Sequence, residues 1–91
     1  MIVKFTRQAS DDLEAIGDHI ARDNPVRAKS FVLELRDACI GLGEFPLRYP
    51  IARFPFAPNV RQRFHGSHAI QYRVDGDIVW IMHIVHAARL A

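Results

Sequence analysis

Apolar runs in the last third of the chain predict three β-strands. Val60–Phe64 places Arg61 and Arg63 two residues apart, which puts both on one face of a strand. Ala69–Val74 and Ile78–His86 follow, and the second of these runs is apolar almost throughout. The Asp-Gly-Asp turn between them is typical of a hairpin, because Asp and Gly tolerate positive φ. The pattern therefore predicts a three-stranded antiparallel meander.

Helical spacing of apolar residues dominates the first half of the chain. Ile2–Phe5 is expected to form a short strand, and Thr6 is suited to cap a following helix. The apolar positions of that first helix recur every three or four residues, at Ala9, Leu13, Ile16 and Ile20. Its acidic residues are interpreted as a solvated face rather than as catalytic carboxylates, and they are Asp11, Asp12, Glu14 and Asp18.

A second helix is expected after the break at Asp23-Asn24-Pro25, because proline fits the first turn of a helix. Its apolar positions form one stripe, made of Ala28, Phe31, Val32, Leu35, Cys39, Leu42 and Phe45. Gly41 and Gly43 weaken its end, and Pro46 stops it. The segment Arg48–Asn59 holds three prolines and is predicted to be an ordered loop.

These elements predict a single α+β domain over residues 1–91: an N-terminal strand, a two-helix antiparallel hairpin and a three-stranded antiparallel meander. The hairpin can bury only one face of the sheet. The last strand, however, carries apolar residues on both faces: strict alternation groups Trp80, Met82 and Ile84 against Val79, Ile81 and Val85. The second face must be covered either by the proline-rich loop, through Phe54 and Phe56, or by another chain.

Charge is distributed unevenly along the chain. The net charge is +2, but Met1–Leu47 has six Lys/Arg against eight Asp/Glu. Arg48–Ala91 has six arginines against two aspartates, a balance of +4. Because the guanidinium fork suits phosphate and carboxylate, the second half is consistent with an anionic partner. An ordinary solvated sheet surface explains the same charges.

The lone Cys39 and the absence of a leader or a long apolar run favour a soluble cytoplasmic protein without disulfides or membrane spans. Cys39 falls on the core stripe of the second helix, so we expect a buried, inert thiol. No cofactor or metal site is expected. His83 and His86 point to opposite faces of a strand, while His65 and His68 flank a turn, and neither spacing matches a zinc pattern.

A family resemblance adds to this interpretation. Its residues extend over nearly the whole chain: Thr6, Ala9, Asp12-Leu13, Ile20, Asn24-Pro25, Phe45-Pro46, Arg61, Ser67-His68, Tyr72-Arg73-Val74, His86 and Arg89. In order and spacing they resemble the RelE/ParE superfamily of toxins from type II toxin–antitoxin modules, on the ParE side. One departure lies at the end of the chain, where the family often has His-x-Arg-Arg and then an acidic residue. Here His86 is followed by Ala87-Ala88-Arg89-Leu90.

The resemblance to ParE implies a toxin that binds DNA gyrase without catalysing a reaction and is neutralised by a ParD-like antitoxin. The residues expected to bind the target are Arg61, Arg63, Arg73, His83, His86 and Arg89. We expect Arg61 and Arg63 to lie on the open face of the sheet beside Gln71 and Arg73, with Val60, Gln62 and Phe64 packed on the helices.

The alternative is a ribosome-dependent mRNA endonuclease of the RelE type, which needs a base, an acid and cations at the scissile phosphate. Arg61, Arg63 and Arg73 are candidate cations, and the four C-terminal histidines are candidate acids or bases. Similar nucleases place a tyrosine near the chain end and carry a lysine-rich segment. Here Tyr72 lies mid-strand, where a core position is expected, and the only lysines are Lys4 and Lys29.

Overall fold

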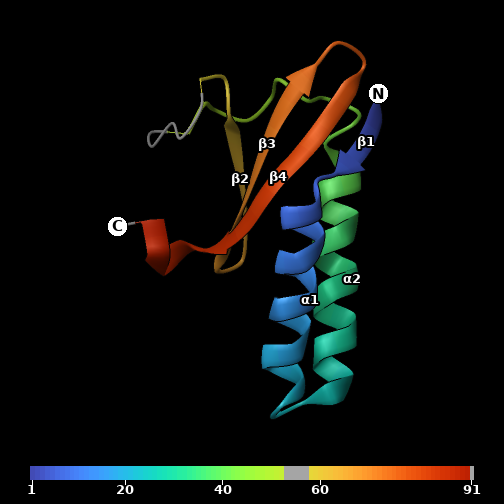
Figure 1. Ribbon diagram of the computed structural model, residues 1–91, viewed down its shortest axis with the longest axis vertical. Helices are drawn as coiled ribbons and strands as arrows, with labels where there is room; N and C mark the ends of the chain where they lie inside the picture. Colours follow the sequence, from blue (N-terminus) through green and yellow to red (C-terminus); the bar gives the residue numbers. More distant parts are fainter. Residues whose placement is uncertain (53–57, 91) are drawn as a thin grey trace.

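The computed structural model describes residues 1–52 and 58–90. Its elements, in chain order, are β1 (Ile2–Phe5), α1 (Arg7–Ala21), α2 (Pro25–Gly41), β2 (Arg61–His65), β3 (His68–Asp75), β4 (Ile78–His86) and the 3₁₀ turn η1 (Ala87–Leu90) (Figure 1). The predicted order of elements is confirmed, and β4 has the predicted bounds. β2 and β3 extend closer to each other than expected, which leaves only Gly66 and Ser67 in the turn.

Short polar side chains set the starts of both helices. The Thr6 side chain accepts a hydrogen bond from the Ala9 N–H at 3.1 Å, and Asn24 does the same for Arg27 at 3.0 Å. Pro25 occupies the first turn of α2. The two helices form the predicted antiparallel hairpin, which extends well beyond the sheet (Figure 1).

The second helix ends earlier than expected. Leu42 caps α2, and Phe45 lies beyond it with 69% of its surface exposed, so its assignment to the helical stripe was wrong. The residues that follow α2 pack against the N-terminus of the chain. The Met1 amino group donates to the Gly43 carbonyl oxygen at 2.9 Å. A side chain at Gly43 would come within 2.7 Å of the Met1 carbonyl oxygen, so only glycine fits.

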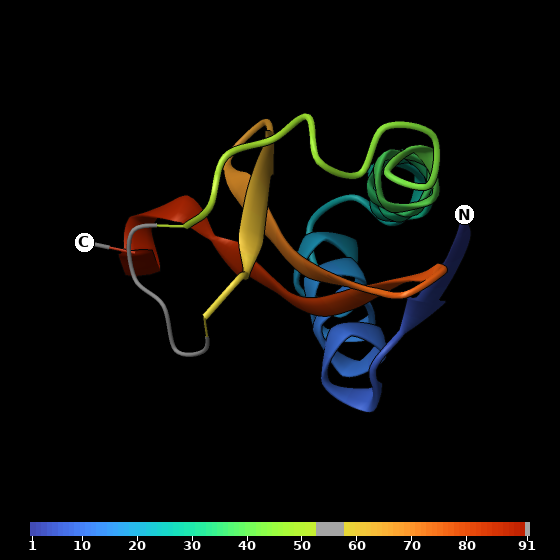
Figure 2. The same cartoon turned by 90° about the horizontal axis from the view of Figure 1, so that it is seen from above.

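The four strands form one sheet in the order β1-β4-β3-β2. β4 pairs antiparallel with β3, and β3 with β2, as the meander requires. β1 pairs with β4 in parallel, so the sheet is mixed rather than wholly antiparallel. β1 and β2 therefore lie at opposite ends of a twisted sheet (Figure 2). No helix in residues 1–52 or 58–90 has the length and apolar character needed to span a membrane.

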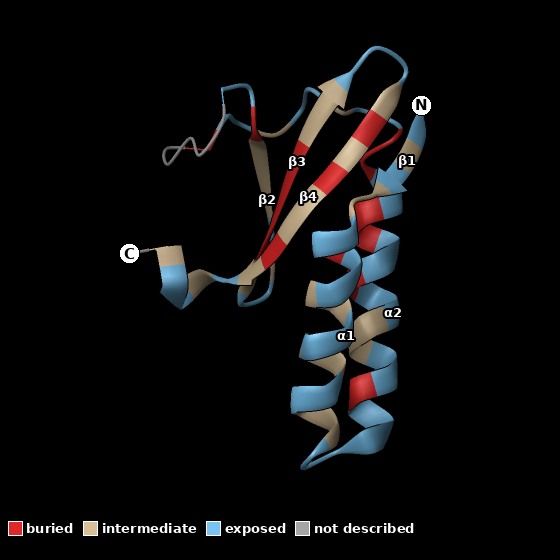
Figure 3. Ribbon diagram, in the orientation of Figure 1, coloured by how far each residue is buried: buried red, intermediate tan, exposed pale blue. Residues whose placement is uncertain are grey.

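Both helices pack on the same face of the sheet. The core joins residues of α1, of α2 with its cap, and of the two central strands, β3 and β4: Ala9, Leu35, Ala38, Cys39, Leu42, Ile70, Tyr72, Val79, Ile81 and Ile84. Buried segments gather on β3, β4 and the part of α2 beside the sheet, whereas the far ends of the helices are mainly exposed (Figure 3). We call the face of the sheet that the helices cover the helix-facing side, and the opposite face of the sheet the open face.

A β-bulge changes the faces predicted for β4. Gln71 pairs with His83 and Tyr72 with Ile81, so Met82 is the extra residue. Because a bulge shifts the alternation by one residue, Ile84 lies on the helix-facing side together with Ile81. The grouping of Ile84 with Trp80 was therefore wrong.

Residues 50–52 pair with the outer edge of β2. The Ala52 N–H donates to the Val60 carbonyl oxygen at 2.8 Å, and the Gln62 N–H donates to that of Pro50 at 3.0 Å. Part of the predicted proline-rich loop is thus strand-like. Phe54 and Phe56 lie outside the described residues, so their covering of the open face stays a prediction.

Candidate functional site

Arg61 and Arg63 lie on the helix-facing side, not on the open face. In the β2–β3 register Arg61 is opposite Tyr72 and Arg63 is opposite Ile70, and both partners are fully buried. Directly opposed residues share a face. The prediction that these arginines lie on the open face was wrong. The residues of β2 alternate in the opposite sense to the one expected, so that Phe64 faces outward and is 57% exposed.

Both arginines donate hydrogen bonds to main-chain carbonyl oxygens of this chain. Arg61 Nη1 donates to Tyr49 at 2.7 Å and to Leu47 at 3.2 Å. Arg63 Nη1 donates to Ala38 at 2.8 Å, and its guanidinium lies 5.2 Å from the centre of the Tyr49 ring. Ala38 is in the last turn of α2, where carbonyl groups lack helical partners. These cations therefore stabilise the α2 terminus and the following loop.

The open face carries a different set of cations. Lys4 of β1, Trp80 of β4 and Arg73 of β3 are consecutive partners across the sheet and form what we call the Trp80 row. The Lys4 ammonium lies 5.9 Å from the centre of the Trp80 ring. Arg73 is on the face predicted for it. Sequence reasoning missed Lys4, although its alternation with Val3 and Phe5 carries the signal.

A polar pair lies next to the Trp80 row on the open face. Gln71 is 4% exposed, and its Nε2 donates to Gln62 Oε1 at 3.0 Å. Tyr72, on the opposite side of β3, is a core residue as predicted, and its hydroxyl donates to the Pro46 carbonyl oxygen at 2.5 Å. Burial raises the pKa of this phenol, which favours its protonated form over the phenolate that a general base would need.

His83 lies at the β4 edge beside an aspartate of α1. Beyond the end of β1, the Asp12 Oδ2 accepts a hydrogen bond from the Ile84 N–H at 2.9 Å. His83 Nδ1 lies 3.9 Å from the same oxygen. Asp12 is only 17% exposed at its side chain, so its interpretation as a solvated residue was wrong. Its carboxylate supplies the acceptor that a neighbouring strand would otherwise give to the Ile84 N–H, because β1 pairs with β4 only as far as Ile81.

Three histidines meet at one end of the helix-facing side. His65, His68 and His86 are register partners across β2, β3 and β4, and we call them the histidine row. The rings of His68 and His86 are 5.2 Å apart. Phe31 of α2 lies 5.4 Å from the His68 ring and 6.0 Å from that of His65. The sequence predicts only that His65 and His68 flank a turn, and the spacing does not reveal that His86 joins them.

The surroundings favour the neutral form of His68. Burial lowers the pKa of His68, and the neighbouring His86 and His65 lower it further. Its Nδ1 is buried without a hydrogen-bond partner. His86 Nδ1 accepts a hydrogen bond from the Ala88 N–H at 3.2 Å. Within residues 1–52 and 58–90 no group of three His, Cys, Asp or Glu side chains is placed to hold a metal ion.

The six residues predicted to bind a target do not form one patch. Arg61 and Arg63 donate to main-chain carbonyl oxygens, whereas Arg73 and His83, the partner of Gln71, lie on the open face. His86 belongs to the histidine row, whereas Arg89 is exposed in η1. Cys39 is buried, as predicted, and burial raises the pKa of its thiol to about 12, which excludes an activated nucleophile.

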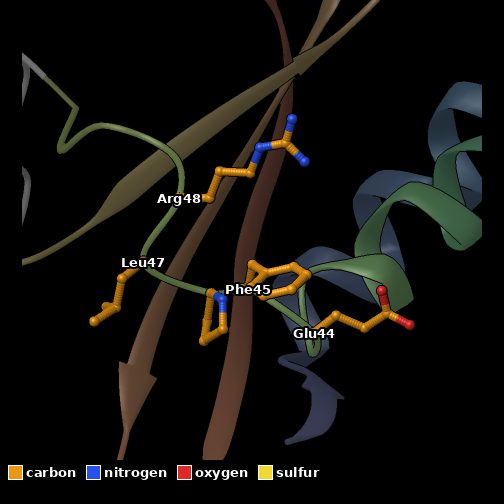
Figure 4. Close-up of a pocket in the computed structure, with 5 residues that line it drawn as sticks. Glu44, Phe45, Leu47 and Arg48 are labelled. Atoms are coloured by element: carbon orange, nitrogen blue, oxygen red, sulfur yellow. The ribbon is translucent and has the colours of Figure 1, made fainter.

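A shallow apolar hollow lies on the connection between α2 and β2. It is lined by Glu44, Phe45, Pro46, Leu47 and Arg48, and the side chains of Phe45 and Leu47 point apart (Figure 4). Leu47 is 64% exposed. The hollow contains no set of groups that could transfer protons, and it is better described as exposed apolar surface.

Comparisons with known proteins agree with this architecture. The family model of the ParE toxin of type II toxin–antitoxin systems matches residues 3–91. Toxin RelE2 of Caulobacter vibrioides is 35% identical over 88 residues, which cover 97% of each chain.

Solved structures show the same fold. A chain of the chromosomal ParDE toxin–antitoxin system of P. aeruginosa superposes with a TM-score of 0.78 and 27% identity, covering 94% of this chain and 95% of that one. The RelBE2 toxin–antitoxin complex of Mycobacterium tuberculosis gives 0.69 and 24% identity, covering 93% and 88%. The chain belongs to the ParE toxin family and is a ParE/RelE-like toxin of a type II toxin–antitoxin system.

Proposed function

We propose that this toxin inhibits DNA gyrase by binding it, without a catalytic step, and that a ParD-like antitoxin neutralises it. The observation that carries the proposal is the internal use of Arg61 and Arg63. Their Nη1 groups donate to main-chain carbonyl oxygens at 2.7 and 2.8 Å on the helix-facing side, which favours a structural role over holding a scissile phosphate. Binding needs no such group, and the open face supplies a surface for it.

The Trp80 row is the part of the open face best suited to contact the target. It combines one large aromatic side chain with a cation on either side, Lys4 and Arg73. Aromatic and arginine side chains contribute most strongly to protein interfaces. Adjacent cations favour an acidic partner surface and speed its encounter.

Antitoxin binding is supported by the exposed apolar surface and by the charge of the C-terminal half. Phe45, Leu47 and Phe64 are each more than half exposed. Exposed apolar surface of this kind marks partner sites in small proteins. The balance of +4 after Leu47 favours an acidic antitoxin segment. The solved P. aeruginosa relative belongs to a ParDE system, which supports a ParD-like partner.

A supercoiling assay with purified gyrase tests the proposal. The wild-type toxin is expected to block supercoiling, and Lys4→Ala combined with Arg73→Ala is expected to weaken inhibition about tenfold or more. Arg22→Ala is the matched control, because it removes an exposed cation at the end of α1, away from the sheet. Unimpaired supercoiling with the wild-type toxin contradicts the proposed target, whereas equal potency of all three proteins contradicts the proposed surface.

A second candidate function is ribosome-dependent mRNA cleavage, and the histidine row favours it. Three imidazoles meet at one end of the sheet, and histidine is the side chain that most often serves as a general acid or base. Primer extension on mRNA from a translation extract tests this function. Cleavage that is lost in both His68→Gln and His86→Gln, but retained in His19→Gln, would assign the toxin to the nuclease branch. Uncleaved mRNA at toxin concentrations that arrest gyrase supports the binding function.

A further inference from the structure

The outer side of α2 carries an apolar stripe that is exposed within the described residues, 1–52 and 58–90. Val26, Leu33 and Ile40 are 82%, 52% and 49% exposed. They are seven residues apart, which places them on one line along the helix. The opposite side of α2 is already packed in the core through Leu35 and Cys39. The stripe is therefore a second apolar face of this helix.

Charged residues border the stripe on both sides, and the two borders differ in sign. Lys29 lies four residues before Leu33, and Arg36 lies three residues after it. This spacing places both on one side of the line. Ser30 and Asp37 lie at the mirrored spacings on the other side. All four are exposed. The face thus has an apolar centre, a basic border and a border that is acidic at Asp37.

This arrangement is complementary to itself in one orientation only. When two such helices pair in parallel about a two-fold axis along their length, the basic border of one meets the acidic border of the other. Arg36 then lies near the partner's Asp37, twice by symmetry. Antiparallel pairing instead brings the two basic borders together, which is unfavourable. We propose that two copies of this chain associate through α2, side by side and in parallel.

The surface beside the stripe is shaped to receive a second helix. Leu33 lines two shallow hollows, one shared with Pro25, Val26, Lys29 and Ser30, and the other between α1 and α2, shared with residues that include Leu13, Gly17 and Val32. A side chain can enter either hollow when ridges of one helix pack into grooves of another.

The dimer is expected to be weak. The 17 residues of α2 span about 25 Å, and a contact along one helix is smaller than the roughly 1,200–2,000 Å² of a standard stable interface. Association therefore depends on concentration, in the range of micromolar or weaker. The Trp80 row lies on the open face, away from α2, so the dimer leaves it accessible.

Sedimentation velocity of the full chain between about 1 µM and 1 mM tests the proposal, and the expected result is a concentration-dependent dimer. Leu33→Glu is expected to raise the dissociation constant at least tenfold. Phe64→Glu is the matched control, because Phe64 is 57% exposed on the open face, and it is expected to dimerise like the wild type.

A charge exchange tests the orientation. In the parallel dimer Arg36→Asp places an acid against the partner's Asp37 and weakens association, and adding Asp37→Arg restores it. In an antiparallel dimer the single change removes a repulsion and tightens association, which would overturn the proposed arrangement. A wild-type chain that stays monomeric up to 1 mM, or a dimer unaffected by Leu33→Glu, overturns the dimer itself.

A third outcome assigns the stripe to another protein. If the wild-type chain is monomeric and Leu33→Glu abolishes capture by the co-expressed antitoxin, the stripe binds the antitoxin and the self-association proposal is wrong. None of these outcomes depends on gyrase, so failure here and failure of the proposed target are distinguishable.

Discussion

The two faces of the sheet use the same residue types for different purposes. On the helix-facing side, Arg61 and Arg63 stand beside fully buried core residues and bind carbonyl oxygens. On the open face, Arg73 and Lys4 flank Trp80 with no carbonyl partner among the hydrogen bonds of the described residues. The sign of a charge along the sequence therefore does not reveal whether it serves folding or recognition. Strand register decides between the two.

The largest expected difference between the faces concerns apolar residues. Ile70→Ala removes a fully buried side chain on the helix-facing side and is expected to lower the free energy of unfolding by about 2–5 kcal/mol. Phe64→Ala, on the open face, is expected to change it by about 0.5 kcal/mol or less, because Phe64 is 57% exposed. Urea unfolding of both variants measures the difference. Equal losses would show that the open face is covered in the folded protein.

The arginines give a smaller contrast of the same kind. Arg63→Ala leaves the Ala38 carbonyl oxygen without its donor and is expected to cost about 1–3 kcal/mol of stability. Arg73→Ala is expected to cost about 0.5 kcal/mol or less while weakening target inhibition. Unfolding curves and the supercoiling assay together separate the two residues. A stable Arg63→Ala protein with reduced inhibition would return Arg63 to the recognition surface.

The elements of the fold were predictable, whereas the faces were not. Long apolar periodicities and caps such as Thr6 and Asn24 fix where helices begin. The phase of β2 is not fixed in this way, because Phe64 is its only apolar residue and it points outward. In β4 the bulge at Met82 reverses the alternation, and nothing in a continuous apolar run marks a bulge.

The candidate site was predicted only in part for a related reason. His65, His68 and His86 meet because three strands align in register, which their separation along the sequence does not show. Asp12 was missed because its partner is a main-chain N–H of β4, 72 residues away. Arg73 was placed correctly because its face follows from the core position of Tyr72 on the same strand.

Asp12 offers the next test, at the edge where the two faces meet. Asp12→Ala removes the acceptor of the Ile84 N–H and is expected to lower the free energy of unfolding by about 1–2 kcal/mol. Asp11→Ala is the control, because Asp11 is an exposed neighbour on α1 and its removal is expected to have almost no effect. Hydrogen exchange at Ile84 should become faster only in the Asp12 variant.

The smallest expected effect is the pH dependence of the histidine row. Because the pKa of His68 is lower in the folded chain than the ordinary 6.5, the folded state binds fewer protons than the unfolded state. The resulting loss of stability is absent well above pH 6.5 and grows as the pH falls through 6.5 toward the folded pKa.

Urea unfolding at pH 7.5, 6.5 and 5.5 should show a decline in the free energy of unfolding of the wild type that is smaller in His68→Gln. His19→Gln removes an exposed histidine of α1 and should retain the full decline. Glu34, whose pKa is lowered mainly by its hydrogen bond with Arg27, loses its contribution only as the pH falls below about 4.5, outside this window. A decline of equal size in all three proteins would show that the histidine row does not hold His68 in its neutral form.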